Sequence, residues 1–255
     1  MRVNNQIRVQ KIKATADLLK NSSYAVAFTG AGISTASGIP DFRSPATGLW
    51  ANYDPFEVAS LTSFQNFPEK FYSWIKPLMI TSRSTKPNFA HFALAKLEHE
   101  GIIKSIITQN IDGLHQEAGS SRVFELHGSI NTASCPNCGT KYTLQYMLDQ
   151  FNNHLDLPLC IKCRMVIKPD ITLFEEMLPQ DAWENAYQEI ILADLVFVIG
   201  SSLEVFPASS LPEIAISKGA KVIINTISAT RFDHQATINL PYDILETIKV
   251  LMQEF

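Results

Sequence analysis

Four short apolar segments constrain the fold of this chain more than any other feature. They are residues 24–29 (YAVAFT), 102–108 (IIKSIIT), 195–199 (LVFVI) and 221–225 (KVIIN). Their length suits buried β-strands, and helical patterns lie between them, as at residues 6–20 and 86–99. Strands that alternate with helices form parallel sheets that are covered on both faces. The sequence therefore predicts an α/β fold built on a large, parallel, Rossmann-like sheet.

Two stretches interrupt this alternation. Residues 46–85 are rich in Phe, Trp, Pro and Ser and contain helical fragments such as FPEKFYSWI, and residues 131–168 contain all the cysteines. We interpret the first as a helical insert and the second as a zinc-ribbon insert, which together build a smaller lobe. The large domain is then expected to be assembled from residues 1–45, 86–130 and 169–255.

The cysteines form two Cys-x-x-Cys pairs, Cys135 with Cys138 and Cys160 with Cys163. Two disulfides would also use all four residues. In a chain with no sign of secretion, however, paired Cys-x-x-Cys turns favour a tetrahedral zinc site. Four thiolates leave no coordination position open for water. We therefore expect one structural Zn²⁺ and no catalytic metal.

Composition narrows the choice of partners and location. The net charge of −4 and the pI of about 5.9 do not favour a protein that grips phosphate backbones, so no nucleic-acid partner is expected. No apolar run approaches the ~20 residues that span a bilayer, so no membrane partner is expected either. The first residues lack the apolar core and cleavage site of a signal peptide, which predicts a cytoplasmic protein.

Small and polar residues stand at the end of every predicted strand: GAGIS (30–34), QNIDGLH (109–115), GSS (200–202) and NT (225–226). Ligands of open parallel sheets bind beyond these carboxyl ends. Gly30 and Gly32 would let the backbone approach a pyrophosphate, with amide donors from the start of a following helix. The dinucleotide fingerprint is incomplete, because Thr35 stands at its third glycine position. Taken alone, the two glycines fit a tight turn equally well.

The order of the motifs is more specific than any one of them. GAGIS is followed by GIPDFRS (38–44), TQNIDGLH (108–115), LHG (126–128), both cysteine pairs, KPDI (168–171), GSSLEV (200–205) and IN (224–225). In this order the set resembles the sirtuin family of NAD-dependent protein deacylases over nearly the whole chain. The resemblance implies NAD as the cofactor and an acyl-lysine protein or peptide as the substrate. It also implies that the acyl group passes to ADP-ribose and that nicotinamide is released.

The resemblance assigns roles by position. His127 matches the catalytic base, with Asn110 and Asp112 beside the nicotinamide and its ribose. A histidine suits this role because its unperturbed pKa of ~6.5 lies near neutral pH. The residues that match the cofactor site are Gly30, Ala31, Gly32, Asp41, Phe42, Arg43, Gln109, Asn110, Asp112, Gly200, Ser201, Ser202, Asn225, Thr226 and Tyr242.

The same resemblance places the substrate peptide as an added strand between residues 174–176 and 202–206. Ile171, Phe174, Glu204 and Val205 are the expected substrate contacts.

Taken singly, the site residues have plainer interpretations: Asp41 and Asp112 as turn or cap residues, and Arg43 as a surface charge. His115 also stands at a sheet end and competes with His127 for the role of base.

The chain departs from the family pattern at two places, which are expected to affect how the substrate is presented and not how NAD binds. Phe174-Glu175-Glu176 replaces the usual F-G-E, and Arg164-Met165 replaces a Gly-Gly pair after the last cysteine. Glycine in the first motif lets a peptide backbone approach closely, so Glu175 is expected to narrow or recharge the cleft.

The acyl group is expected to be apolar. Desuccinylase-type members carry a Tyr-x-x-Arg pair, whereas the nearest residues here are Tyr72 and Ile75. Acetyl or a longer apolar chain is therefore the predicted acyl group. Phe64, Phe67, Phe71 and Trp74 would either wall a long-acyl tunnel or form the core of the small lobe.

Two other functions compete with a deacylase. An ADP-ribosyltransferase or NAD hydrolase on the same fold stays open because Glu175 alters the cleft. A zinc-ribbon module that binds nucleic acid or protein is disfavoured by the acidic pI and by the few basic residues of the zinc insert.

Overall fold

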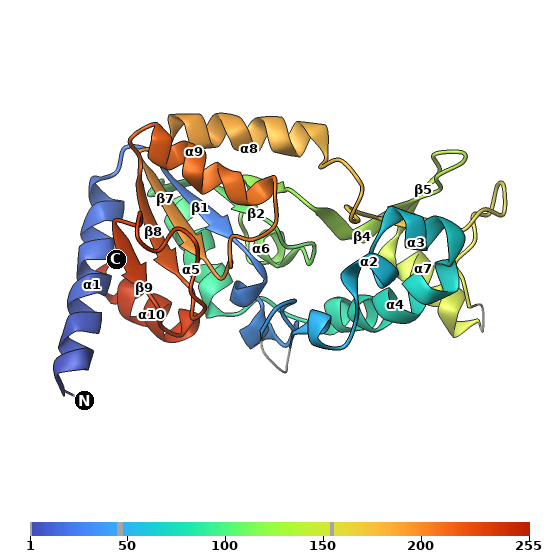
Figure 1. Cartoon of the computed structure of the whole chain (residues 1–255), viewed down its shortest axis with the longest axis horizontal. Coiled ribbons are helices and arrows are strands. Elements are labelled where there is room, and N and C mark those ends of the chain that lie inside the picture. Colours follow the sequence, from blue (N-terminus) through green and yellow to red (C-terminus); the bar gives the residue numbers. More distant parts are fainter. Residues whose placement is uncertain (1, 45–47, 154–155) are drawn as a thin grey trace.

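A six-stranded parallel sheet forms the centre of the larger lobe in the computed structural model, which describes residues 2–44, 48–153 and 156–255 (Figure 1). Its strands are β1 (Ala25–Thr29), β2 (Ile103–Thr108), β3 (Val123–Glu125), β7 (Leu195–Ile199), β8 (Lys221–Asn225) and β9 (Ile238–Leu240), in the order β3-β2-β1-β7-β8-β9. The predicted parallel sheet is confirmed, and all four predicted strands lie at its centre. The outer strands β3 and β9 were not predicted, because three residues are too few to show a periodic pattern.

Helices cover both faces of this sheet. Helices α1 (Arg2–Asn21), α5 (Phe89–His99) and α10 (Ile244–Leu251) pack on one face, and α8 (Gln180–Leu192) and α9 (Leu211–Ser217) pack on the other. Side chains of β1 alternate between the two cores: Ala25 and Ala27 face the first, and Val26 and Phe28 face the second. Helix α5 begins later than predicted because the side chain of Asn88 caps it, accepting a hydrogen bond from Ala90 N at 2.9 Å.

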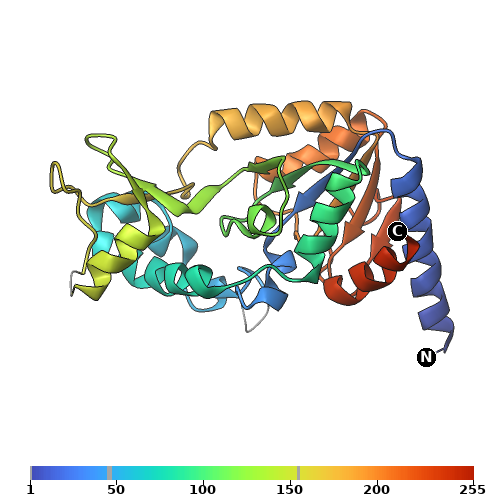
Figure 2. The ribbon, with the colours of Figure 1, turned by 180° about the vertical axis from the view of Figure 1, so that it is seen from behind.

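The smaller lobe lies at the far end of the molecule from α1 (Figures 1 and 2). It contains α2 (Pro55–Val58), α3 (Leu61–Asn66), α4 (Pro68–Ser84), α7 (Leu144–Asn152) and an antiparallel sheet of β4 (Gly128–Ser134), β5 (Lys141–Thr143) and β6 (Lys168–Ile171). Side chains from the helical and the cysteine-containing segments share one apolar core, in which Phe71 and Met79 of α4 join Met147 of α7. Both inserts therefore build the second lobe, as predicted.

The exact division of the chain stays a prediction. The expected boundary at residues 45 and 46 lies outside the described residues. The boundaries at 130/131 and 168/169 fall inside β4 and β6, which pair with each other at Ser134 and Lys168. The two sheets are thus joined through β4, whose first residue directly follows His127.

Hydrogen bonds continue across the sheet beyond the ends of its strands. Gln109 N donates to Thr29 O at 2.9 Å, Gly30 N donates to Ile199 O at 3.0 Å, and Gly200 N donates to Asn225 O at 2.9 Å. The segments that follow β1, β2 and β7 are therefore held side by side at the carboxyl edge. Among the described residues, no helix is long and apolar enough to cross a membrane.

Candidate functional site

Two glycine turns cross each other at the carboxyl edge. Gly32 N donates to Gly200 O at 2.9 Å, and a Cβ on Gly32 would lie 2.8 Å from Gly200 Cα. Gly200 itself has a φ of +68°, which a residue with a side chain adopts only with strain. The main-chain crossing therefore explains both glycines. The helix expected after Gly32 is absent: Gly32 lies within a short 3₁₀ turn, η1 (Ala31–Ile33), and a second 3₁₀ turn, η2 (Thr35–Ser37), follows it.

A cavity of about 750 Å³ lies beside this crossing and is lined by residues of both lobes. Its volume is within the ~300–1,000 Å³ of typical ligand sites. The predicted site residues that line it are Gly30, Ala31, Gly32, Asp41, Phe42, Arg43, Gln109, Asn110, Asp112, His127, Ile171, Phe174, Gly200, Ser201, Ser202, Val205 and Thr226. Residues from distant parts of the sequence are thus brought together around one space.

Three of the predicted cofactor and substrate residues do not line the cavity. Asn225 is fully buried, and its side-chain amide donates to Leu240 O and Tyr242 O at 2.9 and 3.0 Å. Tyr242 lies half-buried with the guanidinium of Arg8 over its ring. Glu204 is exposed at the rim, where its carboxylate pairs with Arg43 at 2.8 Å. Asn225 therefore shapes the edge by holding the segment after β9.

His127 is held in one orientation and one tautomer. Its Nδ1 lies 2.9 Å from Gln109 O, and a carbonyl oxygen can only accept, so Nδ1 carries the proton. In the neutral ring Nε2 is then the basic nitrogen. Burial lowers the pKa of His127, the nearby Arg43 cation lowers it further, and the Gln109 carbonyl opposes both. The imidazole is therefore neutral at neutral pH.

Ser34 connects the polar residues at the inner end of the cavity, although it was not among the predicted site residues. Its hydroxyl donates to Asp112 Oδ2 at 2.7 Å and accepts from Asn110 Nδ2 at 3.1 Å. Burial raises the pKa of Asp112, while hydrogen bonds from Leu114 N–H and Ser34 oppose that shift. Ser34 closes the GAGIS motif, so its place in that motif was the available signal.

The segment 41–44 lies along the rim of the cavity. Asp41 Oδ1 accepts from Arg43 N and Ser44 N at 2.9 and 2.7 Å, which fixes the turn. The ring of Phe42 packs on Trp50 with centroids 5.1 Å apart, and Trp50 stacks on Trp74 at 5.7 Å. This aromatic wall joins the segment to α4 of the small lobe.

The residues proposed for an acyl tunnel have different surroundings. Phe64 and Phe71 are buried in the core of the small lobe, and Phe67 is exposed. Of that aromatic set, Trp74 lines the cavity. Tyr72 and Ile75 are buried core residues away from the cavity lining, and the Tyr72 hydroxyl donates to Ile167 O. The two residues that were compared with the Tyr-x-x-Arg pair therefore belong to the core of the small lobe.

The two departures from the family pattern share one backbone property. Glu175 and Arg164 both have positive φ, of 75° and 64°, which explains why glycine suits both positions. The carboxylate of Glu175 accepts from Thr62 N at 2.9 Å, near the start of α3, which partly offsets the strain. Glu175 thus lies at the cavity rim with its charge held against the small lobe.

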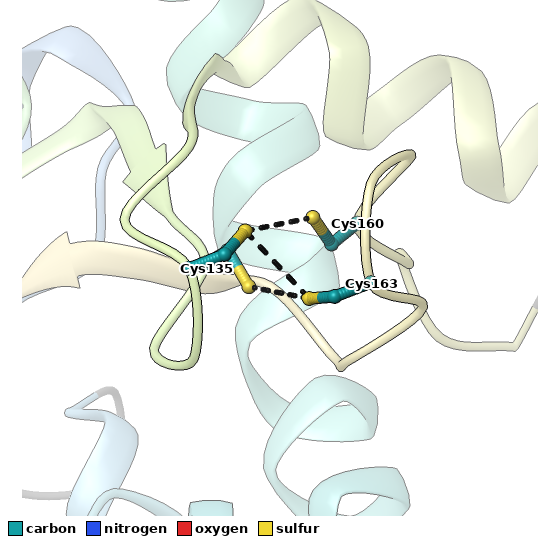
Figure 3. Close-up of side chains that lie close together, drawn as sticks. Cys135, Cys160 and Cys163 are labelled. Atoms are coloured by element: carbon teal, nitrogen blue, oxygen red, sulfur yellow. Dashed lines mark hydrogen bonds between the residues drawn. The ribbon is translucent and has the colours of Figure 1, made fainter.

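The four cysteines gather at the end of the small lobe, with all sulfur atoms within 4.8 Å of one another. Figure 3 shows the side chains of Cys135, Cys160 and Cys163 pointing toward each other. All four are free thiols, and hydrogen bonds from Thr140 lower the pKa of Cys138. Four sulfurs around Zn²⁺ at ~2.3 Å would lie about 3.8 Å apart, so the cluster fits a structural zinc ion.

The turns that carry the thiols explain this convergence. Gly139 N donates to Cys135 O and Arg164 N donates to Cys160 O, both at 2.9 Å. The residue after each pair adopts positive φ, 69° at Gly139 and 64° at Arg164. Each Cys-x-x-Cys pair is thus folded into the same tight turn, which directs two sulfurs to one point.

Comparisons with known proteins agree with this geometry. Residues 30–207 match the model of the Sir2 family. The chain is 43% identical to an NAD-dependent protein deacetylase of Thermotoga maritima over 244 residues, covering 96% of this chain and 98% of the relative. It is 46% identical over 224 residues to NAD-dependent protein deacylase 2 of Archaeoglobus fulgidus, covering 88% of this chain and 87% of the relative.

Solved structures give the same result. A Sir2 bound to a p53 peptide and NAD⁺ superimposes with a TM-score of 0.89 at 42% identity, covering 95% of this chain and 98% of that structure. A Sir2 variant with deacetylated p53 peptide and 3′-O-acetyl-ADP-ribose gives a TM-score of 0.92 at 43% identity over the same shares. This chain belongs to the Sir2, or sirtuin, family.

Zinc removal tests the role of the cysteine cluster. We expect a chelator that strips zinc to lower the melting temperature by about 5 °C or more, because the coordination bonds that join the two turns are then lost. Calorimetry with zinc content measured on the same sample would check this, and added Zn²⁺ should restore the transition. A zinc-free sample with an unchanged melting temperature would contradict the assignment.

Proposed function

We propose that this chain is an NAD-dependent protein-lysine deacylase, which transfers an acyl group to ADP-ribose and releases nicotinamide. The observation that carries the proposal is the placement of His127. Its Nδ1–H is engaged by Gln109 O, and its ring lines the cavity shared by the three strand-end segments. The names of the relatives and the ligands of the matched Sir2 structures support the same activity.

NAD and the acyl-lysine would both fit this cavity. When bound, NAD would supply a ribose carbon that loses nicotinamide as the leaving group and forms a bond to the acyl oxygen. The crossing at Gly32 and Gly200 leaves backbone uncovered by side chains where the diphosphate would lie, and Asn110 and Asp112 line the inner end, where they would contact the nicotinamide and its ribose. His127 then accepts a ribose hydroxyl proton at Nε2. Phe42 lies where it would exclude water from the reacting centre.

The acyl group that suits the cavity is uncharged. Among the described residues, Arg43 is the one cation in its lining, and its guanidinium is paired with Glu204. Phe42, Trp50, Trp74 and Phe174 line the side toward the small lobe. The peptide is expected to lie between Phe174–Glu176 and Ser202–Phe206 as an added strand. We further propose a cytoplasmic location, because the four cysteines form one cluster that fits a zinc ion, and such thiols stay reduced in that compartment.

Product analysis tests the proposed activity. We expect wild-type protein with NAD and a panel of acyl-lysine peptides to give nicotinamide, free lysine peptide and O-acyl-ADP-ribose by mass spectrometry. His127→Ala should lower the rate by about 10²–10⁴-fold, the usual contribution of a general base. The exposed His234 supplies the control, since His234→Ala should keep wild-type turnover.

Nicotinamide release without loss of the acyl group would contradict the deacylase proposal. It would favour an ADP-ribosyltransferase or NAD hydrolase, the alternative that stays open because the Glu175 carboxylate alters the cavity rim. Deacylation that persists in His127→Ala at the wild-type rate would contradict the assignment of the base.

The pH dependence tests the state of His127. Because the base works in its neutral form, kcat/KM for the peptide falls as pH drops through the His127 pKa, which burial and Arg43 hold below 6.5. We expect Arg43→Gln to move the midpoint of that fall to higher pH, because the cation no longer opposes protonation. Arg43→Lys keeps the charge and should keep the midpoint. A profile measured at saturating NAD that stays in place for Arg43→Gln would refute this account.

A further inference from the structure

Two buried histidines lie directly behind the site and take no part in the proposed chemistry. His91 comes from α5 and His115 from α6 (Leu114–Glu117), and their side chains are 0% and 1% exposed. Their rings meet edge to face with centroids 5.0 Å apart. Neither ring lines the cavity, so neither can exchange a proton with a ligand there. His115 is thus excluded as the competing base.

His115 reaches the site through two threonines. Its Nε2 lies 2.9 Å from Thr29 Oγ1, and the Thr29 hydroxyl donates to Thr108 Oγ1 at 2.8 Å. Because the one hydroxyl proton of Thr29 is directed at Thr108, His115 Nε2–H is the donor to Thr29. Thr108 Oγ1 in turn accepts from Asn110 N at 3.0 Å. A continuous chain of hydrogen bonds thus runs from His115 to the backbone of Asn110.

His91 reaches the other side of the same segment. Its Nδ1 accepts from Asn88 N at 3.3 Å in the cap of α5, which leaves the proton on Nε2. That nitrogen lies 3.4 Å from Ser34 Oγ. The Ser34 hydroxyl already donates to Asp112, so it receives the His91 N–H as an acceptor. His91 therefore favours the hydroxyl orientation that donates to the Asp112 carboxylate.

We propose that His115 and His91 are positioning residues, which hold Asn110 and Asp112 from two sides through Thr29–Thr108 and through Ser34. The proposal rests on the proposed function, because it assigns these histidines to the segment that would contact nicotinamide and its ribose. The segment has no regular secondary structure to fix it, so these contacts supply the order that a helix or strand would otherwise provide.

Burial keeps both rings neutral, as these roles require. It lowers the pKa of His91 to about 4 and that of His115 to about 3, with repulsion between the two rings adding to the second shift. His115 Nδ1 is buried without a hydrogen-bond partner among the described residues. A proton there would be a buried, unpaired N–H, which is costly. The single Nε2–H tautomer is thus the stable one.

A double-mutant cycle on NAD tests the proposal. His115→Leu removes the donor, Thr29→Val removes the relay hydroxyl with little change of volume, and the third variant carries both changes. If His115 acts through Thr29, each variant should lose about tenfold in kcat/KM for NAD, and the double variant should also lose about tenfold rather than a hundredfold. The KM for peptide should stay within about twofold of wild type, because that contact lies elsewhere.

Two further variants separate positioning from folding. His115→Gln keeps a donor and should recover kcat/KM for NAD to within about threefold of wild type. Thr15→Val removes an equally buried hydroxyl in α1 and should leave it within about twofold. Should His115→Leu fail to fold, Thr29→Val and Ser34→Ala still report on the two arms.

Three results would overturn the proposal. They are variants that melt earlier but keep wild-type kcat/KM for NAD, losses for His115→Leu and Thr29→Val that multiply, and no recovery in His115→Gln. NAD affinity measured by calorimetry on the wild type identifies the source of failure. Wild-type protein that binds no NAD overturns the proposed function as well, whereas wild-type affinity with unaffected variants overturns the histidine roles alone.

Discussion

The crossing of two main-chain turns at Gly32 and Gly200 is the contact on which the rest of the site depends. With a Cβ on Gly32 only 2.8 Å from Gly200 Cα, no other residue fits without moving one turn. The crossing sets where the segment after β1 leaves the sheet. Ser34, Asp41 and Arg43 all lie in the segment that follows, so their positions around the cavity depend on where it leaves the sheet.

Hydrogen bonds around this crossing hold the polar groups of the site in place before charge develops in the reaction. Gln109 shows this best, because its carbonyl sets the tautomer of His127 while its side-chain amide donates to Ser201 Oγ at 2.7 Å. One residue at the end of β2 thereby links the base to the turn after β7. Such preorganisation costs nothing at the moment of reaction, which is where catalysis gains from a rigid scaffold.

Sequence patterns predicted the parts of this structure that depend on local signals. The central strands, the two inserts and the zinc turns followed from apolar runs and cysteine spacing. The family resemblance named a set of cofactor and substrate residues, and most of that set lines the cavity. The three-residue strands β3 and β9 were too short to give a pattern, and the 3₁₀ turns η1 and η2 stand where a helix was expected. These features depend on tertiary contacts, about which the periodicity of the sequence gives no information.

Side-chain direction was the other gap. Asn225 was expected at the cofactor, yet its amide is used to hold Leu240 and Tyr242 carbonyls. Tyr72 and Ile75 occupied the right sequence positions for an acyl-binding pair but face the core, whereas Trp74 faces the cavity. Successive residues on a helix point about 100° apart, so a match in sequence position does not tell which of them faces the cavity.

Hydrogen–deuterium exchange with and without NAD is the most direct test of the central claim, that the carboxyl edge around Gly32 and Gly200 is the cofactor site. The account predicts slower exchange on adding NAD in residues 30–44, 109–112, 200–202 and 226–228. Exchange in helix α8, which packs on one face of the sheet away from the cavity, should not change. Protection that appears elsewhere, or unchanged exchange in all four segments at saturating NAD, would contradict it.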